Sequence, residues 1–463
     1  MAGPHSCSLV FLRPLPFITP LTLLALVVAF AAFWPFSGLQ ARVFDAQQFT
    51  LDNGLTVVVV ENHRAPIVHH MVWYKVGAAD EAPGESGNAH FLEHLMFKGT
   101  ESLAPGEFSE IVARNGGREN AFTSWDYTAF YQTVAKDRLD IVMGLEADRM
   151  VNLVLTDEVV LPEREVVREE RRSRVDNDPS GQLGEVARAS LYLNHPYRIP
   201  IIGWDHEITE LNTQTVLDFY KRWYAPNNAI VVISGDVSLD EVKALAEKHY
   251  GAIPAKDLPG RDRIAEPPHN AERRITLESP RVNQPSVSIR YLAPSYRTGT
   301  NGEAYALQVL SEILGGGSSS RLYSELVVDQ GLASAAGGGY GADSYDLTSF
   351  NFFAAPRPDK DIDEVEDALR AQIERVRSEG VTAEEVAAAQ KRLISAAVFA
   401  RDSLGAGPSI IGRAMATGRS LAEVENWPDL IQEVTVEQVN AAARQVFDDK
   451  SSVTAVLLPE PLS

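Results

Sequence analysis

The stretch "GNAHFLEHLMFKGT", Gly87 to Thr100, places three polar side chains with chemical potential close together. If this stretch is a helix, His90 and His94 lie on one face about one turn apart, so both imidazoles can bind a single metal ion. Glu93 follows His90 by three residues and lies on nearly the same face. Its carboxylate can therefore reach a water molecule on that ion. The spacing predicts a metal site with an adjacent base.

Two histidines leave a metal site one ligand short. The order H-x-x-E-H is the inverse of the H-E-x-x-H motif of zinc peptidases and permits the same chemistry. A catalytic zinc takes three protein ligands and keeps a fourth position for water. The stretch "LPEREVVREERRSRV", in a helix predicted from about Asp157 to Arg174, offers four candidates: Glu163, Glu165, Glu169 and Glu170. Glu163 and Glu170 share a face, which suits one ligand and one carboxylate behind the ligands. Taken alone, such a run is more typical of a solvated helix face.

The elements around these residues alternate between strand and helix patterns. "GLTVVVVEN" and "HHMVWYKVGA" predict strands, and "ENAFTSWDYTAFYQTVA" predicts a hairpin with Ser124 to Asp126 at the bend. The pattern "AIVVISGDV" predicts a further strand, followed by a helix over 238–250. This mixture indicates an α+β fold.

The second half of the chain repeats the first in outline. "SVSIRYLAPS", "EAYALQVLSEILGGG", the strands "LASAAGGGYGAD" and "LTSFNFFAAP", and the helix "TAEEVAAAQKRLISA" follow in the same order, without the histidines. Between the halves, "PAKDLPGRDRIAEPPHNAE" is rich in proline and charge and lacks periodicity. We therefore predict a duplicated domain, with a zinc-bearing copy over 45–253, a linker over 254–272 and a copy without zinc over 273–463.

Composition and the N-terminus restrict the remaining possibilities. The 463 residues carry a formal net charge of −21, which gives no field to attract nucleic acid, and the single cysteine, Cys7, permits neither an internal disulfide nor a cysteine metal site. Residues 1–41 contain a long apolar run after Arg13 and end in small residues. They predict an export signal, with an uncleaved membrane anchor as the alternative.

The chain resembles the pitrilysin/insulysin zinc peptidases, a family that includes mitochondrial processing peptidase and its bacterial relatives. "GNAHFLEHLMFKGT" is close to the family signature, and "EREVVREE" lies about the expected distance downstream. The resemblance implies one Zn²⁺ per chain held by His90, His94 and Glu170, with Glu93 as general base and Glu163 as the carboxylate behind the ligands. It also implies that two similar domains, each a mixed, mostly antiparallel sheet flanked by helices, face each other like a clamshell.

The segment "GGRENAFTSWDYTAFY" is similar to the family's substrate-binding edge. There an extended peptide adds as a strand beside the residues that match Asn120, Ala121, Phe122 and Thr123, and backbone pairing gives affinity with little demand on sequence. An ordinary hairpin remains the alternative, because an edge strand and a substrate platform look alike in sequence.

One departure from the family concerns the second domain. Single-chain and homodimeric members carry there an Arg and a Tyr that hold the substrate, whereas this chain has Val327 and Ser334 at the matching positions. Valine has no donor and serine is too short to replace a phenol. The resemblance therefore implies a zinc-dependent endopeptidase that acts as the catalytic subunit of a heterodimer, with a homologous zinc-less subunit supplying the Arg/Tyr pair.

The expected setting and the competing functions follow from the same features. We expect peptide substrates, no nucleic acid and contact with a membrane only through residues 1–41. The expected location is the bacterial periplasm, free or anchored in the inner membrane. The alternative function is a non-catalytic structural subunit or a peptide-binding protein of the same fold, against which the intact set His90, Glu93, His94 and Glu170 argues.

Overall fold

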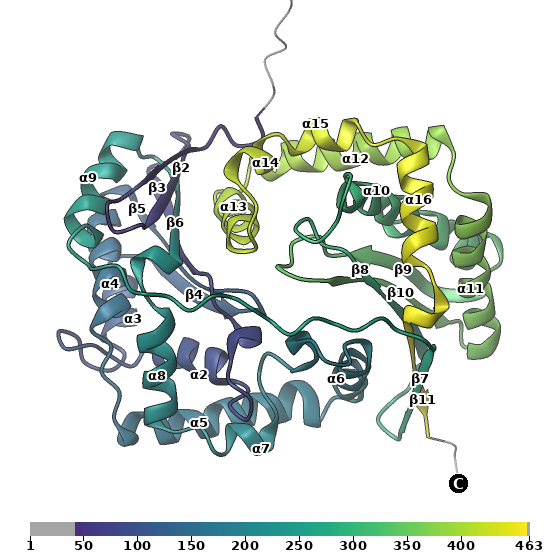
Figure 1. The fold of residues 1–463 in the computed structure, drawn as a ribbon, viewed down its shortest axis with the longest axis horizontal. Coiled ribbons are helices and arrows are strands. Elements are labelled where there is room, and N and C mark those ends of the chain that lie inside the picture. Colours follow the sequence, from purple (N-terminus) through teal and green to yellow (C-terminus); the bar gives the residue numbers. More distant parts are fainter. Residues whose placement is uncertain (1–41, 461–463) are drawn as a thin grey trace, which may run out of the picture. The chain divides into compact units, whose positions relative to one another are not determined.

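The first of two β-sheets is built from residues 47–235 in a computed structural model that describes residues 42–460 (Figure 1). Its strands are β1 (Gln47–Thr50), β2 (Thr56–Glu61), β3 (Ile67–Tyr74), β4 (Arg118–Thr123), β5 (Thr128–Ala135) and β6 (Ala229–Gly235). They lie in the order β1-β2-β6-β3-β5-β4, and β4 forms one edge. The valine-rich β2 and β6 lie side by side in the interior and are almost completely buried.

The second sheet repeats this arrangement in five strands and lacks a counterpart of β1. It contains β7 (Arg273–Ser279), β8 (Ser286–Ala293), β9 (Ala333–Tyr340), β10 (Thr348–Pro356) and β11 (Ser452–Pro459), in the order β7-β11-β8-β10-β9. One pair in each sheet is parallel, β2 with β6 and β7 with β11, and the other pairs are antiparallel. The predicted α+β class and the duplicated, mostly antiparallel sheets are therefore confirmed.

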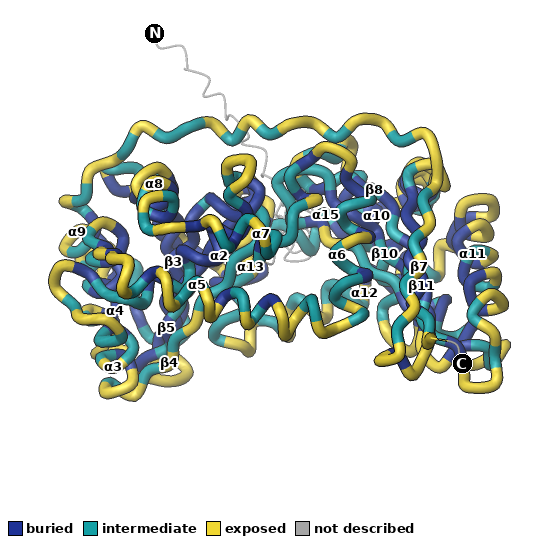
Figure 2. The backbone as a smooth tube through the Cα atoms, turned by 90° about the horizontal axis from the view of Figure 1, so that it is seen from below, coloured by how far each residue is buried: buried dark blue, intermediate teal, exposed yellow. Residues whose placement is uncertain are grey.

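Helices flank both sheets, whose strands are drawn largely buried in Figure 2. The first half contains α2 (Asn88–Leu95), α3 (Glu107–Arg114), α4 (Leu139–Val151), α5 (Asp157–Arg171), α6 (Pro179–Leu191), α7 (Asp205–Ile208), α8 (Thr213–Trp223) and α9 (Leu239–Tyr250). The second contains α10 (Glu303–Gly315), α11 (Ile362–Glu379), α12 (Ala383–Ala400), α13 (Ala406–Ala416), α14 (Leu421–Glu425), α15 (Trp427–Gln432) and α16 (Val436–Val446). The helix predicted to reach Arg174 ends as α5 at Arg171 and continues as a π-helical turn, η3 (Arg172–Asp176).

Each half of the chain places one helix on the sheet of the other half. Helix α6 packs on β7, β8 and β11, and helix α13 packs on β3 and β6. Gly412 of α13 permits this close approach, because a Cβ atom there would overlap the indole of Trp73 on β3. The exchange brings side chains of α6 and β8 together beside the first sheet's β4.

The segment between the sheets is extended and is fixed to both halves. Residues 254–270 contain neither helix nor strand. The Arg263 guanidinium is buried and lies 2.8 Å from Asp80, 2.5 Å from Asp126 and 3.2 Å from Asp346. These carboxylates come from both halves, so Arg263 ties the segment to each of them. The predicted domain boundaries stay a prediction.

The expectations for the N-terminus concern residues 1–41, which lie outside the described residues. Among residues 42–460, no helix combines the length and the apolar character that a membrane span requires.

Candidate metal centre

Helix α2 carries His90, Glu93 and His94 and is held firmly at its start. Gly87 precedes the helix with φ +90° and touches the loop at Ile202, whose carbonyl oxygen would lie 2.6 Å from a Cβ atom at this glycine. The Glu81 carboxylate accepts hydrogen bonds from the backbone N–H groups of Gly87 and Ala89 at 3.0 and 2.7 Å. These contacts fix the helix while its apolar residues, including Phe91, Leu92 and Leu95, pack into the core.

Helix α5 packs against α2 and presents two glutamates to its polar face. Oε2 of Glu170 lies 3.6 Å from Nε2 of His90 and 3.4 Å from Nε2 of His94. Oε1 of Glu163 lies 3.0 Å from the other nitrogen of His94, Nδ1. The two glutamates therefore contact different nitrogens of His94: Glu170 lies near Nε2, on the side of His90, and Glu163 lies near Nδ1, on the opposite side.

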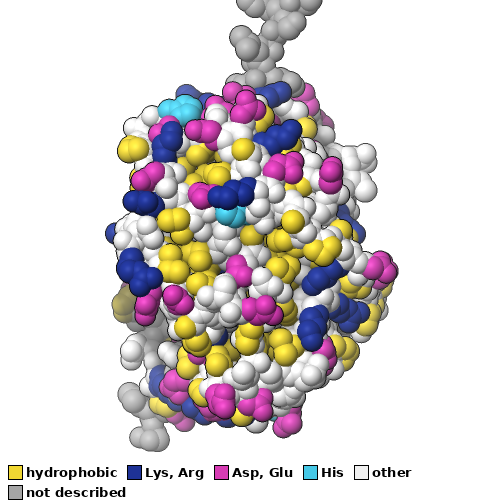
Figure 3. Space-filling model, turned by 90° about the vertical axis from the view of Figure 1, so that its left-hand side faces the viewer, with side chains coloured by type: hydrophobic (Ala, Val, Ile, Leu, Met, Phe, Trp, Pro, Cys, Tyr) yellow, Lys and Arg dark blue, Asp and Glu magenta, His cyan; other side chains and the backbone are white. Residues whose placement is uncertain are grey.

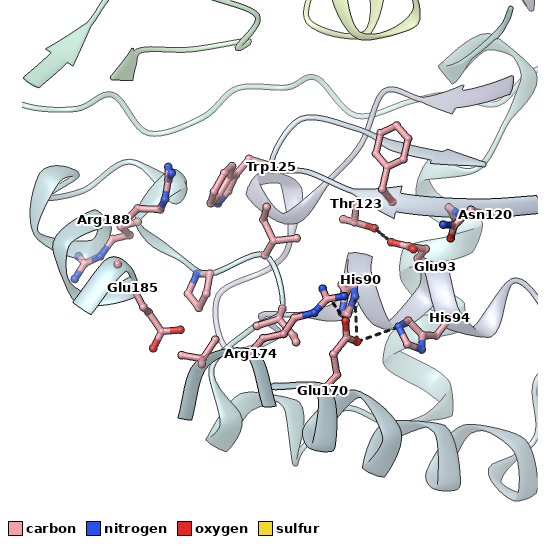
Figure 4. Close-up of a pocket in the computed structure, with 18 of the residues that line it drawn as sticks. His90, Glu93, His94, Asn120, Thr123, Trp125, Glu170, Arg174, Glu185 and Arg188 are labelled. Carbon is pink, nitrogen blue, oxygen red and sulfur yellow. Dashed lines mark hydrogen bonds and ion pairs between the residues drawn. The ribbon is translucent and has the colours of Figure 1, made fainter. Parts of the chain in front are cut away.

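The donor set fits a metal ion. One ligand atom from each of His90, His94 and Glu170 can be chosen so that all three lie within 4.8 Å of one another, and Figure 4 shows these side chains pointing toward one another. Oε2 of Glu170 is buried and has no hydrogen-bond donor among the described residues. Two imidazole nitrogens and a carboxylate oxygen are the ligands of a catalytic zinc site with an open position.

The two histidines differ in their surroundings. Burial lowers the pKa of His90 to about 4, so this imidazole is neutral near pH 7, as a metal ligand must be. Burial also acts to lower the pKa of His94, but the hydrogen bond to Glu163 and the nearby negative charge of Glu170 outweigh it and raise that pKa to about 9. Glu163 is held in turn by Lys98, whose Nζ lies 2.6 Å from Oε2.

Glu93 is placed beside the histidines with a bond to the neighbouring strand. The Thr123 hydroxyl donates to Oε2 of Glu93 at 2.5 Å. Burial raises the pKa of the Glu93 carboxyl above its usual range, although the Thr123 bond opposes this. A carboxyl group with a raised pKa is suited to accept and return a proton near neutral pH.

The predicted substrate edge forms a wall of the same cavity. Strand β4 pairs only with β5 among the described strands, so its other edge is open for an added strand. A cavity of about 710 Å³ is lined by the metal-centre residues and by Asn120, Ala121, Phe122 and Thr123. The structure therefore brings all nine residues predicted for the site to one place, except that Glu163 lies behind His94 rather than in the cavity wall.

Several side chains of this site were not predicted. Arg174 lies 2.7 Å from Oε1 of Glu170, and its position four residues after Glu170 was a signal that could have indicated this pair. Arg188 and Arg290 also line the cavity, from α6 and from β8. No local pattern marks these two arginines, because the exchange of helices brings them together.

Val327 and Ser334 do not line the cavity. Val327 is buried in the core of the second half, within the π-helical turn η6 (Tyr323–Asp329). The Ser334 hydroxyl accepts a hydrogen bond from Gln284 at 2.7 Å. Neither residue contributes to the metal centre.

Comparisons with known proteins identify a family of peptidases. Residues 56–203 match the family model described as insulinase (peptidase family M16), and residues 210–393 match the peptidase M16 inactive domain. The chain is 35% identical to the zinc protease PqqE of Helicobacter pylori over 344 residues, which is 73% of this chain and 76% of that protein. It is 32% identical to an uncharacterised zinc protease of Mycobacterium leprae, over 90% of this chain and 93% of that protein.

A solved structure supports the same relationship. The crystal structure of a protease from Helicobacter pylori superposes with a TM-score of 0.83 and 31% sequence identity. The match covers 90% of this chain and all of that one.

Proposed function

Because this chain belongs to the insulinase family of peptidases, M16, we propose that it is a zinc-dependent endopeptidase that hydrolyses peptides or short unfolded polypeptides. The observation that carries the proposal is the convergence of His90, His94 and Glu170 within 4.8 Å, with Glu93 lining the same cavity. The alternative is a structural subunit or a peptide-binding protein of the same fold. The complete set of ligands and base favours the enzyme.

The chain's own residues supply binding and proton transfer. His90, His94 and Glu170 hold the zinc, which when bound lowers the pKa of a water molecule and polarises the carbonyl group to be cleaved. Glu93 accepts the proton of the attacking water and delivers it to the leaving amine. Glu163 orients His94 through Nδ1, and Thr123 orients the carboxylate of Glu93.

The open edge of β4 binds the substrate as an added strand. Backbone groups of Asn120 to Thr123 pair with the peptide, which requires an extended substrate but little particular sequence. The Thr123 end of this strand lies next to Glu93, so a peptide bound there passes the catalytic base. Unfolded segments meet this requirement, and folded domains do not.

We further propose that the chain works with a homologous zinc-less subunit, because Val327 and Ser334 stand where substrate-holding residues are expected and neither lines the cavity. The chain alone should cleave peptides slowly and the pair quickly. Equal rates with and without the partner would remove the need for a second subunit.

We also propose export to the periplasm from the pattern of residues 1–41, which N-terminal sequencing of the mature protein in that compartment would test.

Metal removal tests the proposed enzyme directly. The chain, alone and with its partner, is incubated with a mixed peptide library before and after treatment with a chelator. The proposal predicts that cleavage is lost with the metal and returns on addition of one equivalent of Zn²⁺. A protein that binds peptides and zinc but cleaves nothing in any of these states would be the peptide-binding alternative.

A further inference from the structure

Two arginines on one wall of the cavity have no acidic partner. Arg188 on α6 and Arg290 on β8 both line the cavity that contains His90 and Glu93. Within residues 42–460, neither guanidinium forms an ion pair with a carboxylate. Besides burial, the groups that shift the pKa values of the two arginines are Tyr192, Tyr197 and, for Arg290, Arg188.

The surroundings of Arg188 hold its charge in place without neutralising it. Its guanidinium lies over the ring of Trp125, 4.0 Å from the centroid. The nearest acid along α6, Glu185, is already engaged by Arg171, which donates to both carboxylate oxygens at 2.8 and 3.0 Å. In Figure 4, Trp125 lies between Arg188 and Thr123 at the end of β4. Arg188 therefore stands just beyond that end of the substrate edge.

Arg290 approaches from the second sheet. Its guanidinium donates to the backbone oxygen of Gly184, one turn before Arg188, at 3.4 Å. Burial lowers the pKa of both arginines, and the positive charge of Arg188 lowers the pKa of Arg290 further. Two like charges that are poorly hydrated and lack a counter-charge raise the free energy of the free enzyme, and a bound anion relieves this.

The local charge contrasts with that of the whole chain. The protein carries a formal net charge of −21, and acidic and basic side chains are interspersed on the face drawn in Figure 3. Among the residues that line the cavity, Glu93 and Glu170 belong to the metal centre and Glu185 is paired. The wall formed by α6 and β8 is therefore locally positive.

From this arrangement we propose that Arg188 and Arg290 form a subsite that binds a carboxylate of the peptide substrate. The subsite deepens the proposed function, on which it rests, by selecting peptides with an acidic group at one fixed distance from the cleaved bond. A guanidinium matches a carboxylate with two parallel hydrogen bonds, and the two arginines come from separate elements that can grip one anion from two sides. The carboxylate is that of an Asp or Glu side chain or of the peptide's C-terminus.

The test compares peptides that differ by one charge. A neutral extended peptide is made as a series in which a single Glu or the isosteric Gln is moved through each position. For the full chain with its partner, the proposal predicts a kcat/KM at least tenfold higher for Glu than for Gln at one position, expressed mainly in KM. The ratio of kcat/KM for the Glu peptide to that for the Gln peptide should fall to about one in Arg188→Gln and in Arg290→Gln. Arg290→Glu should instead favour a peptide with Lys at that position. Arg222→Gln, an exposed arginine outside the cavity, should keep the ratio.

A binding measurement separates this proposal from the proposed function. Fluorescence anisotropy of labelled Glu and Gln peptides with Glu93→Gln reports the subsite without cleavage. Tighter binding of the Glu peptide that is lost in the double variant of Arg188 and Arg290 supports the subsite even if no peptide is ever cleaved. Equal affinity for both peptides would overturn it even if the chain is an active peptidase. A preference that disappears when the C-terminus is amidated would assign the subsite to the terminal carboxylate.

Discussion

The side chain of Thr123, at the end of the substrate edge β4, donates its hydroxyl hydrogen to Oε2 of Glu93 at 2.5 Å. In the proposed mechanism, this bond connects the substrate-binding strand to the general base. The strand that we propose to bind the substrate therefore also holds the carboxylate of Glu93 in place.

Removing that hydroxyl should slow catalysis without removing the metal. Thr123→Val keeps the shape of the side chain, and because a hydrogen bond to a charged group is worth about 1.5–3 kcal/mol, kcat should fall by about tenfold or more. Zinc content and KM should change little, and Thr123→Ser should recover most of the rate. A valine variant with the wild-type kcat would show that the bond does not position Glu93.

The carboxylate behind His94 should control metal affinity. Glu163→Gln removes the negative charge that binds Nδ1 of His94 and the ammonium group of Lys98. Zinc affinity should therefore fall by about 10–100-fold. Competition with a chromophoric chelator measures the change. Glu165→Gln, on the same helix but half exposed and paired with Arg168, is the matched control and should bind zinc normally. Equal losses in both variants would contradict the assigned orientation of His94.

The buried His69 should make stability fall in mild acid. Burial lowers its pKa to about 4, below the value near 6.5 in the unfolded chain, so the unfolded state binds more protons as the pH falls below about 6.5. Between pH 6.5 and 5 this group should remove about 1.5 kcal/mol from the free energy of unfolding. Urea unfolding at both pH values should show that the free energy of unfolding falls less between pH 6.5 and 5 in His69→Gln than in wild type. His206→Gln, at an exposed site, should follow the wild type, and a His69→Gln protein with the wild-type slope would refute the assignment.

The start of the described chain depends on a carboxylate from the C-terminal half. Glu425 is buried and accepts hydrogen bonds from the backbone N–H groups of Phe44 and Ala46 at 2.9 and 2.8 Å. Glu425→Ala leaves these donors without an acceptor, so the free energy of unfolding should fall by about 2–4 kcal/mol. The exposed Glu433→Ala should change it by less than about 0.5 kcal/mol. Denaturant unfolding of both variants measures these changes. A change as small in Glu425→Ala as in Glu433→Ala would show that the hydrogen bonds of Glu425 to residues 44 and 46 do not stabilise the fold.

Much of the fold could be predicted because its signals are local. The valine runs of β2 and β6, the hairpin of β4 and β5, and the repeated order of elements are visible in short stretches. The place of β11 in the interior of the second sheet, beside β7, could not be predicted, because that pairing joins residues 180 positions apart. The exchange of α6 and α13 between the sheets is non-local in the same way.

The residues of the candidate site likewise fall into those with a local sequence signal and those brought together by non-local packing. The pair His90 and His94 on one turn of helix, and Glu170 on a predicted helix, followed from spacing and family resemblance. The Thr123 hydroxyl was predicted only as part of a backbone platform, because its contact with Glu93 depends on how β4 packs against α2. Arg188 and Arg290 meet only through the exchanged helix, so neither residue has a sequence signal of its own.

The proposed function is tested most directly by measuring bound zinc and peptide cleavage together in the wild type and in Glu93→Gln, each with the proposed partner subunit. The amide keeps the shape of the side chain but cannot accept the proton of water. We predict about one zinc per chain in both proteins and a cleavage rate reduced by about a thousandfold in the variant. Undiminished cleavage by Glu93→Gln, or a wild type that holds no zinc, would contradict the proposed function.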